Sequence, residues 1–436
     1  MKNVFVLFLI CSVYALPYSQ DSFKIVGIHP RAAEQNSVTG KIITTLFPWQ
    51  GKLYAGYGDY GANTGPIDIY AFDPDSQAFT FKWEANTEAI YNFRAYNGQV
   101  FAPAIDRKSY GKPGDFTKLD SNGVWADYNF GSNSTHVYDV ARLSGSDIYM
   151  VGSQEERAAV WRSQNNGMTW QRIHTDTAIS GIADDFARYY FAGVLDGKLY
   201  VQAKDFYGSI HPYSDVWNGT QWERDTSMFG SSTYVFGWRP DTLAGKMVLL
   251  SNSPGYSSLL RTFDGEAGSI LQNTWVFDFM VDTGFLYALV DSGFGKILVK
   301  RTPDLVNWHT LASAPLGSRS LAVMNDKIYI GMNDSRIMEY TKLLSDIITG
   351  VHDEEEKVTD IVLFPNPCVD ELNIILPWED ITIASVFDYS GKLLHHQKLY
   401  GAEGSIDVSS LLPGFYLLKL EIRDFVLTQK FVKSLK

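Results

Sequence analysis

The chain has 436 residues, of which 45% are hydrophobic and 20% are charged, and its formal net charge is −12. This hydrophobic content excludes wholesale disorder, and the acidic balance argues against a nucleic acid partner, because phosphate binding needs a concentrated Lys and Arg surface. The 26 Phe, 25 Tyr and 36 Gly favour half-buried strands joined by tight turns. The composition therefore predicts an all-β protein.

The first residues have the pattern of a secretory signal peptide. Lys2 precedes an apolar run that starts at Val4, and small or neutral residues follow up to Ala15. The run is shorter than the roughly 20 residues that a membrane-spanning helix needs, so we predict a signal peptide over residues 1–15. Its cleavage would remove Cys11 and leave Cys368 as the one cysteine, which excludes an intramolecular disulfide.

Seven short segments share one pattern, a turn followed by an aromatic or branched apolar strand, as in Gly-Lys-Leu-Tyr-Ala-Gly at 51–56. The third residues of the seven copies are Leu53, Val100, Ile148, Leu199, Met247, Leu286 and Ile328, spaced 39 to 51 residues apart. We call these seven residues the anchors. Their spacing is typical of the blades of a β-propeller.

A tryptophan marks a later strand in most of these units. Trp83, Trp125, Trp170, Trp222 and Trp308 follow their anchors by 22 to 30 residues. No such strand follows Ile328, and the segment Phe23–Ile28 is the best candidate for the missing one. Its pairing with the last unit would close the ring and remove exposed sheet edges. We therefore predict a seven-bladed β-propeller over residues 21–343, with six or eight blades as alternatives.

Residues 163–170, Ser-Gln-Asn-Asn-Gly-Met-Thr-Trp, resemble the Asp-box (BNR) hairpin of sialidase-type propellers, with Asn165 in the place of the Asp. Asn can make the same side-chain-to-backbone bonds in a turn. A looser version lies at 301–304 with Trp308. The resemblance implies a structural hairpin away from the catalytic face, and it does not imply sialidase activity. Sialidases need an arginine triad, and the sequence has no convincing Arg-Ile-Pro start for one.

The pattern changes after an acidic segment, which we predict as a linker over residues 344–357. Short alternating strands with Gly and Pro turns follow and predict a small immunoglobulin-like β-sandwich over residues 358–436. Four motifs stand in order there: Pro-Asn-Pro at 365–367, Tyr-Ser-Gly-Lys at 389–392, Leu-Pro-Gly-Phe-Tyr at 412–416 and Lys-Phe-Val-Lys at 430–433. The segment resembles the type A C-terminal sorting domain of the type IX secretion system of Bacteroidota. The resemblance implies recognition by that machinery and an extracellular or surface-attached protein. Beyond the signal peptide no segment is long and apolar enough to cross a bilayer, so we expect no transmembrane segment once the signal peptide is removed.

A ring of polar residues is expected at one rim of the propeller. The residues six positions after the anchors are Asp59, Asp106, Gln154, Asp205, Ser253, Ser292 and Asp334. Such a ring could bind sugar hydroxyls, or its Asp59, Asp106, Asp205 and Asp334 could ligate a hard cation such as Ca²⁺. The alternative is that these residues only cap turns at strand ends. No cofactor is firmly predicted.

The same rim should receive a Gly-rich loop over 56–66 and the starts of the inner strands. The loop offers Asp59, Tyr60 and Asn63 to a ligand, and the strand starts offer Arg94, His136, Arg188, Arg239 and Arg319. A polysaccharide lyase needs a base to remove the proton next to a carboxylate and a cation to stabilise the resulting anion. His136 with Tyr138 or Tyr190, and Arg94 or Arg188, could fill these roles.

Three functions fit this sequence, because a propeller fold alone does not choose among them. The first is a secreted or surface propeller that binds glycan or protein through its polar rim. The second is a carbohydrate-active enzyme on extracellular polysaccharide, a lyase before a glycoside hydrolase. The third is a structural component of the cell envelope. Convergence of His, Tyr and Arg in one place would favour the enzyme.

Overall fold

The structure of the chain is a computed structural model. It describes residues 23–130, 134–228, 238–251, 258–293, 295–349, 362–376, 382–388, 391–422 and 425–434. The predicted signal peptide, Ser253 and most of the acidic segment lie outside the described residues. The chain divides into two compact units, Met1–Thr349 and Gly350–Lys436.

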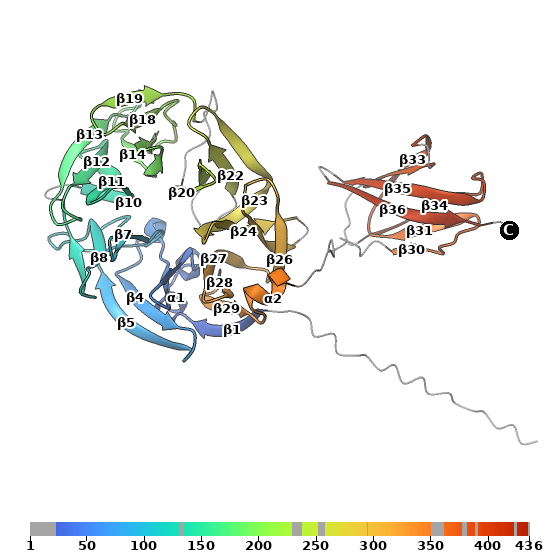
Figure 1. The fold of residues 1–436 in the computed structure, drawn as a ribbon, viewed down its shortest axis with the longest axis horizontal. Helices are drawn as coiled ribbons and strands as arrows, with labels where there is room; N and C mark the ends of the chain where they lie inside the picture. The colour runs from blue at the N-terminus through green and yellow to red at the C-terminus, as the bar shows by residue number, and fades with distance from the viewer. Residues whose placement is uncertain are drawn as a thin grey trace, which may run out of the picture. The chain divides into compact units, whose positions relative to one another are not determined.

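The described part of the first unit forms seven antiparallel four-stranded blades around a central axis, as predicted (Figure 1). Blade 1 contains β2 (Thr45–Trp49), β3 (Lys52–Gly56), β4 (Ile67–Asp73) and β5 (Ala78–Ala85), and blade 2 contains β6 (Arg94–Tyr96), β7 (Gln99–Pro103), β8 (Phe116–Leu119) and β9 (Trp125–Tyr128). Blade 3 contains β10 (Ser134–Ser144), β11 (Asp147–Gln154), β12 (Arg157–Ser163) and β13 (Gln171–Asp176). Blade 4 contains β15 (Gly193–Leu195), β16 (Lys198–Val201), β18 (Ser214–Trp217) and β19 (Trp222–Asp225). A short ladder of β14 (Ala187–Tyr189) and β17 (Ala203–Asp205) extends blade 4.

Blades 5 and 6 share one strand. They contain β20 (Trp238–Leu243), β21 (Lys246–Leu250) and β22 (Ser258–Phe263), then β23 (Gly268–Asp282), and then β24 (Phe285–Asp291), β25 (Ile297–Thr302) and β26 (His309–Ala314). β23 pairs with β22 in its first part and with β24 in its second part. Because no loop separates the two blades, the anchors Met247 and Leu286 are closer in sequence than any other pair of neighbours.

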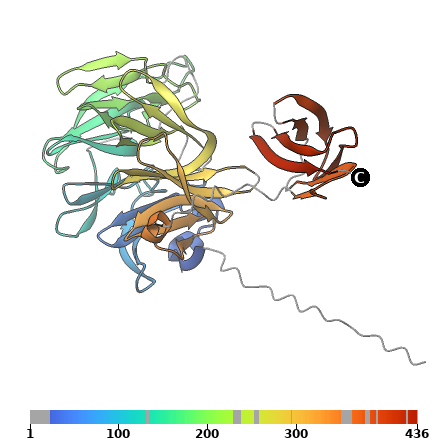
Figure 2. The ribbon, with the colours of Figure 1, turned by 45° about the vertical axis from the view of Figure 1, so that its right-hand side comes forward.

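The N-terminal strand closes the ring. Blade 7 contains β27 (Ser318–Met324), β28 (Lys327–Met332), β29 (Arg336–Tyr340) and β1 (Phe23–Ile28). β1 runs antiparallel to β29, with Phe23 opposite Tyr340 and Ile28 opposite Arg336. Figures 1 and 2 both show this blue strand beside the orange strands of the last blade. The predicted closure is confirmed.

The anchors explain why these segments become strands. All seven lie on the second strand of a blade and are at most 1% exposed. Residues on either side of an anchor alternate between the two faces of the sheet, and each face packs against a neighbouring blade. The hydrophobic clusters therefore lie between blades, as in the cluster that joins Leu53 of blade 1, Val100 of blade 2 and Ala322 of blade 7.

The Asp-box-like hairpin has the bonds expected from its sequence. Asn165 Oδ1 accepts from Thr169 N at 2.9 Å, and Ser163 Oγ accepts from Gly167 N at 2.8 Å. The looser version makes a similar turn, in which Asp304 Oδ1 accepts from Val306 N and Asn307 N. Asn165 thus replaces the acidic residue without loss of the turn.

Three short helical turns precede or enter the first blade, α1 (Pro30–Ala33), η1 (Thr39–Lys41) and η2 (Tyr60–Ala62). A further helix, α2 (Leu344–Thr349), follows the last blade. Leu344 is buried against blades 6 and 7, and its N–H donates to Asp326 O at 2.7 Å. Residues 344–349, expected at the start of the linker, therefore form a helix that packs against the propeller through Leu344 and Ile347.

The second unit is a sandwich of two sheets, one of β30 (Val362–Phe364), β31 (Glu371–Ile375) and β34 (Glu403–Asp407), the other of β32 (Thr382–Phe387), β33 (Leu393–Leu399), β35 (Gly414–Ile422) and β36 (Phe425–Lys433). Their shared core includes Leu372, Val386, Leu418 and Phe431, together with Cys368. The predicted β-sandwich is present. None of the helices in the described parts of the chain has the length and apolarity to span a bilayer.

Candidate functional site

Four of the residues predicted for a lyase converge at the start of the inner strands. His136 and Tyr138 lie two apart on β10 of blade 3, and Arg188 and Tyr190 lie two apart on and just after β14 of blade 4. Arg188 Nη2 lies 3.3 Å from His136 Nε2, and Arg188 Nη1 donates to Tyr138 Oη at 3.1 Å. The Tyr138 and Tyr190 rings are 4.5 Å apart. We call these four residues the His–Tyr–Arg cluster.

His136 is placed between an acid and a hydroxyl. Its Nε2 lies 3.4 Å from Asp106 Oδ2, and its Nδ1 lies 3.3 Å from Ser153 Oγ. Burial lowers the pKa of His136 below its usual value of 6.5, although Asp106 opposes this shift. Nε2 faces both Arg188, which can only donate, and the Asp106 carboxylate, which can only accept. In the tautomer with its proton on Nδ1, toward Ser153, the lone pair of Nε2 is the basic site.

The two tyrosines remain protonated at neutral pH. Burial raises the pKa of Tyr138 and of Tyr190, and the neighbouring Tyr60 adds to the shift in both. Tyr60, a predicted ligand residue, is 51% exposed. The cluster thus combines a neutral base, a permanent cation and two phenol donors, with Tyr60 beside it.

Glu88 is a residue of this site that the sequence interpretation missed. Its N–H donates to Asp106 O at 2.9 Å, so it lies beside the carboxylate that faces His136. Burial, followed by the charge of Asp106, raises the pKa of Glu88 to about 7. Glu88 occupies no position that repeats from blade to blade. The one sequence signal was that Glu88 is the single charged residue between positions 85 and 93.

Arg94 and Arg239 are used inside the propeller. Arg94 Nε lies 3.3 Å from Asp139 Oδ1 and Arg239 Nη1 lies 2.6 Å from Asp278 Oδ1, with each carboxylate at most 1% exposed. The second oxygen of each carboxylate accepts a backbone N–H from the following blade, Ala192 N at 3.0 Å and Leu321 N at 2.8 Å. We call these two arrangements the inter-blade clamps.

A β-bulge explains the clamps. The register of the inner strand shifts directly before each aspartate, between Val137 and Asp139 and between Val276 and Asp278. A bulge re-aims the side chain that follows it, here toward the next blade. Arg319 is a further arginine expected at the start of an inner strand, like Arg94 and Arg239. It donates to Ser318 O at 2.8 Å, and its Cζ lies 4.8 Å from the Phe277 ring centroid.

The predicted polar ring is divided among separate local partners. Asp205 is fully buried and bonds to His211 Nε2 at 2.9 Å, whereas Asp334 forms an exposed ion pair with Arg336 at 2.7 Å. Asp59 caps the η2 turn by accepting from Ala62 N. Among the residues that the structure describes, no three His, Cys, Asp or Glu side chains are grouped to hold a metal ion.

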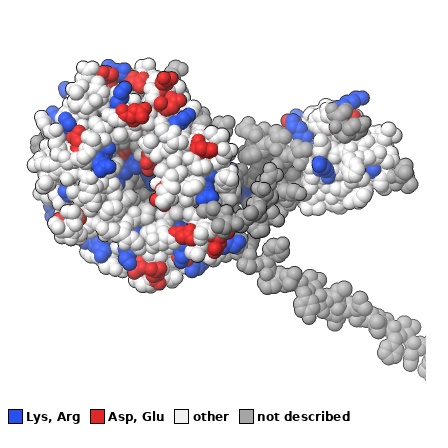
Figure 3. All heavy atoms as spheres, in the orientation of Figure 1, with Lys and Arg blue, Asp and Glu red and all other residues white. Residues whose placement is uncertain are grey.

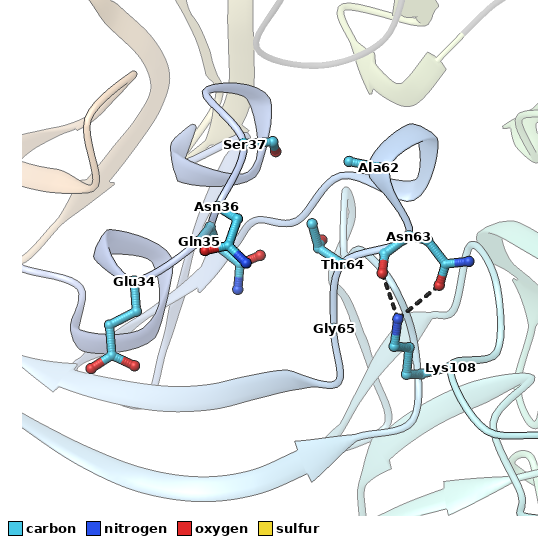
Figure 4. A pocket seen from close by; sticks show the side chains of 9 residues that line it. All are labelled: Glu34, Gln35, Asn36, Ser37, Ala62, Asn63, Thr64, Gly65 and Lys108. Atoms are coloured by element: carbon cyan, nitrogen blue, oxygen red, sulfur yellow. Dashed lines mark hydrogen bonds between the residues drawn. The ribbon is translucent and has the colours of Figure 1, made fainter.

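A polar pocket of about 510 Å³ lies next to this site (Figure 4). Its lining is Glu34, Gln35, Asn36, Ser37, Ala62, Asn63, Thr64, Gly65 and Lys108. Figure 4 shows Lys108 reaching toward Asn63, a predicted ligand residue, and Lys108 Nζ donates to Asn63 Oδ1 at 2.7 Å. Thr64 Oγ1 donates to Glu88 O at 3.1 Å, which connects the pocket wall to the His–Tyr–Arg cluster through Glu88 and Asp106.

Charges of both signs are interspersed over the propeller face drawn in Figure 3, including near its centre. The face has no broad field of one sign. Electrostatic attraction at this face would therefore depend on individual charged side chains rather than on a broad field.

The comparisons with known proteins identify the second unit. Residues 362–434 match the family model of the secretion system C-terminal sorting domain. No curated protein sequence matches this chain. The fold and this domain define a secreted or cell-surface β-propeller protein that carries a type IX sorting domain.

Solved structures of low similarity accompany this match. Virginiamycin B lyase from Staphylococcus aureus is 10% identical, covers 71% of this chain and 97% of its own, and has a TM-score of 0.46. A PL25 ulvan lyase is 13% identical over 71% of this chain and 96% of its own, with a TM-score of 0.43. Trypanosoma rangeli sialidase is 12% identical, covers 81% of this chain and 84% of its own, and has a TM-score of 0.39. Likeness at this level carries no information on activity.

Proposed function

We propose that the propeller is a polysaccharide lyase that cleaves an anionic, uronate-containing glycan outside the cell. The observation that supports this proposal is the His–Tyr–Arg cluster, in which a neutral base, a cation and a phenol lie close to one another. A base beside a cation and a phenol is the set of groups that elimination next to a carboxylate requires.

Each residue has a role in β-elimination. Arg188 pairs with the carboxylate of the sugar, which moves its Nη2 away from His136 and makes the proton on the adjacent carbon more acidic. His136 Nε2 removes this proton, and the electron pair of the broken C–H bond forms a carbon–carbon double bond. The glycosidic C–O bond breaks, and its oxygen takes the proton of Tyr190, the more exposed of the two phenols.

Asp106 then stabilises the product state of the enzyme. When His136 Nε2 carries the transferred proton, it can donate to Asp106 Oδ2, 3.4 Å away. An imidazolium beside a carboxylate is favoured by their charges. The tyrosinate recovers a proton from solvent and the imidazolium releases its proton to solvent, which restores the enzyme without an oxidant or a reductant.

Hydrolysis is the second candidate, on one observation. Glu88 has a pKa of about 7 and lies beside Asp106, so the two carboxyl groups could form the acid and base of a glycoside hydrolase. Glu88 is 5% exposed and the members of the His–Tyr–Arg cluster are 5–9% exposed, so burial does not separate the two candidates. Elimination uses a base, a cation and a phenol that lie together, and it therefore accounts better for the arrangement.

The test uses the full chain and a panel of uronate polymers: alginate, polygalacturonate, chondroitin sulfate and a sulfated algal uronate polymer, with dextran as the neutral control. We expect ultraviolet absorbance from the new double bond together with shorter chains for at least one of them. His136→Ala should lower kcat by about 10²–10⁴-fold, the usual contribution of a general base. His309→Ala, at an exposed position on β26, is the control. Equal activity of the two variants would contradict the assignment.

A further inference from the structure

Three parallel aromatic rings lead from the His–Tyr–Arg cluster to solvent. The Phe186 ring lies 6.4 Å from the His136 ring at an interplanar angle of 20°, and the Phe206 ring lies 5.1 Å from the Phe186 ring at 13°. Phe186 is half-buried, and Phe206 is 52% exposed. An apolar surface therefore adjoins the base of the proposed reaction.

The backbone that carries the two phenylalanines is tied together by hydrogen bonds. Phe206 N donates to Phe186 O at 2.8 Å, next to the ladder that pairs Ala187 with Asp205. Asp185 Oδ1 accepts from Phe186 N at 2.9 Å and from Tyr207 N at 3.2 Å. One carboxylate therefore joins the segment that carries Phe186 to the segment that carries Phe206. A surface that is ordered before binding loses little entropy when a ligand arrives.

Arg188 adds a cation to these rings. Its Cζ lies 4.5 Å from the Phe186 centroid and 5.2 Å from the Phe206 centroid, while its Nη atoms face His136 and Tyr138. A single exposed phenylalanine would need no explanation. Here the exposed ring is stacked on a second ring, next to a guanidinium and a histidine, which is a combination that suits a ligand with one apolar face and one negative charge.

A uronate sugar has these two features. The C–H groups on one face of a pyranose ring are apolar, and its carboxylate projects from the edge of the ring. We propose that Phe206 and Phe186 form a sugar-stacking subsite that holds the sugar next to the cleaved bond, with the carboxylate directed to Arg188. This subsite rests on the proposed function for its position relative to cleavage, but its binding role can be tested separately.

The test compares Phe206→Ala with Phe81→Ala. Phe81 lies on β5 of blade 1 and is also 52% exposed, so it controls for the loss of an exposed aromatic ring. Binding is measured by affinity electrophoresis in the full chain that also carries His136→Ala, with the same uronate polymers and dextran. We expect Phe206→Ala to weaken binding by about tenfold, equivalent to about 1.4 kcal/mol, and Phe81→Ala to leave it unchanged. Phe206→Trp should restore binding, which a merely misfolded variant would not do.

The outcomes separate the subsite from the lyase. If the wild-type chain forms no double bond but Phe206→Ala weakens glycan binding and Phe206→Trp restores it, the subsite stands and the lyase proposal fails. If the chain is a lyase and Phe206→Ala binds as tightly as Phe81→Ala, the subsite is overturned and the lyase stands. Failure of the wild-type chain to bind any uronate polymer overturns both.

Discussion

Removal of the Asp278 carboxylate should destabilise the propeller strongly while leaving the His–Tyr–Arg cluster intact. In Asp278→Ala, the guanidinium of Arg239, whose side chain is 12% exposed, would lose the carboxylate that is 2.6 Å away in the wild type. The backbone N–H groups of Phe279 and Leu321 would also lose the acceptor that they reach at 2.8 Å. Asp278 is fully buried, and burial raises its pKa to about 6, so solvent cannot replace these contacts.

The magnitude follows from the loss of one partner of a buried ion pair, which costs about 3–5 kcal/mol. For a domain somewhat larger than 250 residues, about 4 kcal/mol corresponds to a fall in Tm of roughly 6–8 °C. Asp334→Ala removes a carboxylate that is 48% exposed in its side chain and pairs with Arg336. Such a surface pair contributes about 0–1 kcal/mol, so this variant is the matched control.

The assay is thermal unfolding followed by tryptophan fluorescence, with guanidinium unfolding as a second measure of stability. We expect a large fall in Tm for Asp278→Ala and almost none for Asp334→Ala. Below its Tm, Asp278→Ala should bind uronate polymers as the wild type does. A Tm equal to that of Asp334→Ala would refute the inter-blade clamp as a source of stability.

Two further predictions concern pH and the cation. Burial alone lowers the pKa of His211, but its bonds to Asp176 and Asp205 outweigh burial and raise the pKa above 6.5. The stability that these two contacts supply is thus complete below pH 6.5 and is lost as the pH rises through the folded-state pKa of His211. The Tm of the wild type should fall over this pH range, and the Tm of His211→Gln should depend less on pH. Arg188→Lys keeps the charge but loses the fork that reaches both His136 and Tyr138, so we expect kcat to fall about 10²-fold with Tm little changed, whereas an unchanged kcat would argue against Arg188 as the carboxylate partner.

The blades could be predicted from the sequence because the anchors repeat at similar intervals. The burial of the anchors could also be predicted, because they lie within short runs of aromatic and branched apolar residues. Closure by β1 could be predicted as well, since one strand was missing at the end of the last unit. The continuous strand β23 could not, because a strand that passes from one blade to the next has no turn signal of its own.

The His–Tyr–Arg cluster could be predicted in part. His136 and Arg188 occupy the starts of neighbouring inner strands, and a propeller brings those starts together. Arg94 and Arg239 occupy similar positions, but bulges turn Asp139 and Asp278 toward them, and a bulge leaves no mark in the residue pattern. The partners are also far apart in the sequence, 45 residues for Arg94 with Asp139.

The remaining site residues depend on loop conformation. Asp205 and Asp106 occupy the same position after their anchors, yet Asp205 is fully buried against His211 while Asp106 reaches His136. Phe206 was missed because an aromatic residue in a turn has the same sequence signal whether it is buried or exposed. Asp106 contacts the neighbouring blade, whereas Asp205 contacts a loop of its own blade, and the strand repeat encodes neither contact.

The measurement that tests the central claim most directly is the cleavage of a uronate polymer by the full chain in oxygen-labelled water. Elimination adds no water to the product, so each cleavage should give one fragment with a double bond at its new non-reducing end, with no label beyond the reducing-end exchange of a standard oligosaccharide, and His136→Ala should form almost none. Saturated fragments labelled above that exchange would show hydrolysis and contradict the role assigned to His136. Undiminished formation of unsaturated fragments by His136→Ala would contradict it equally.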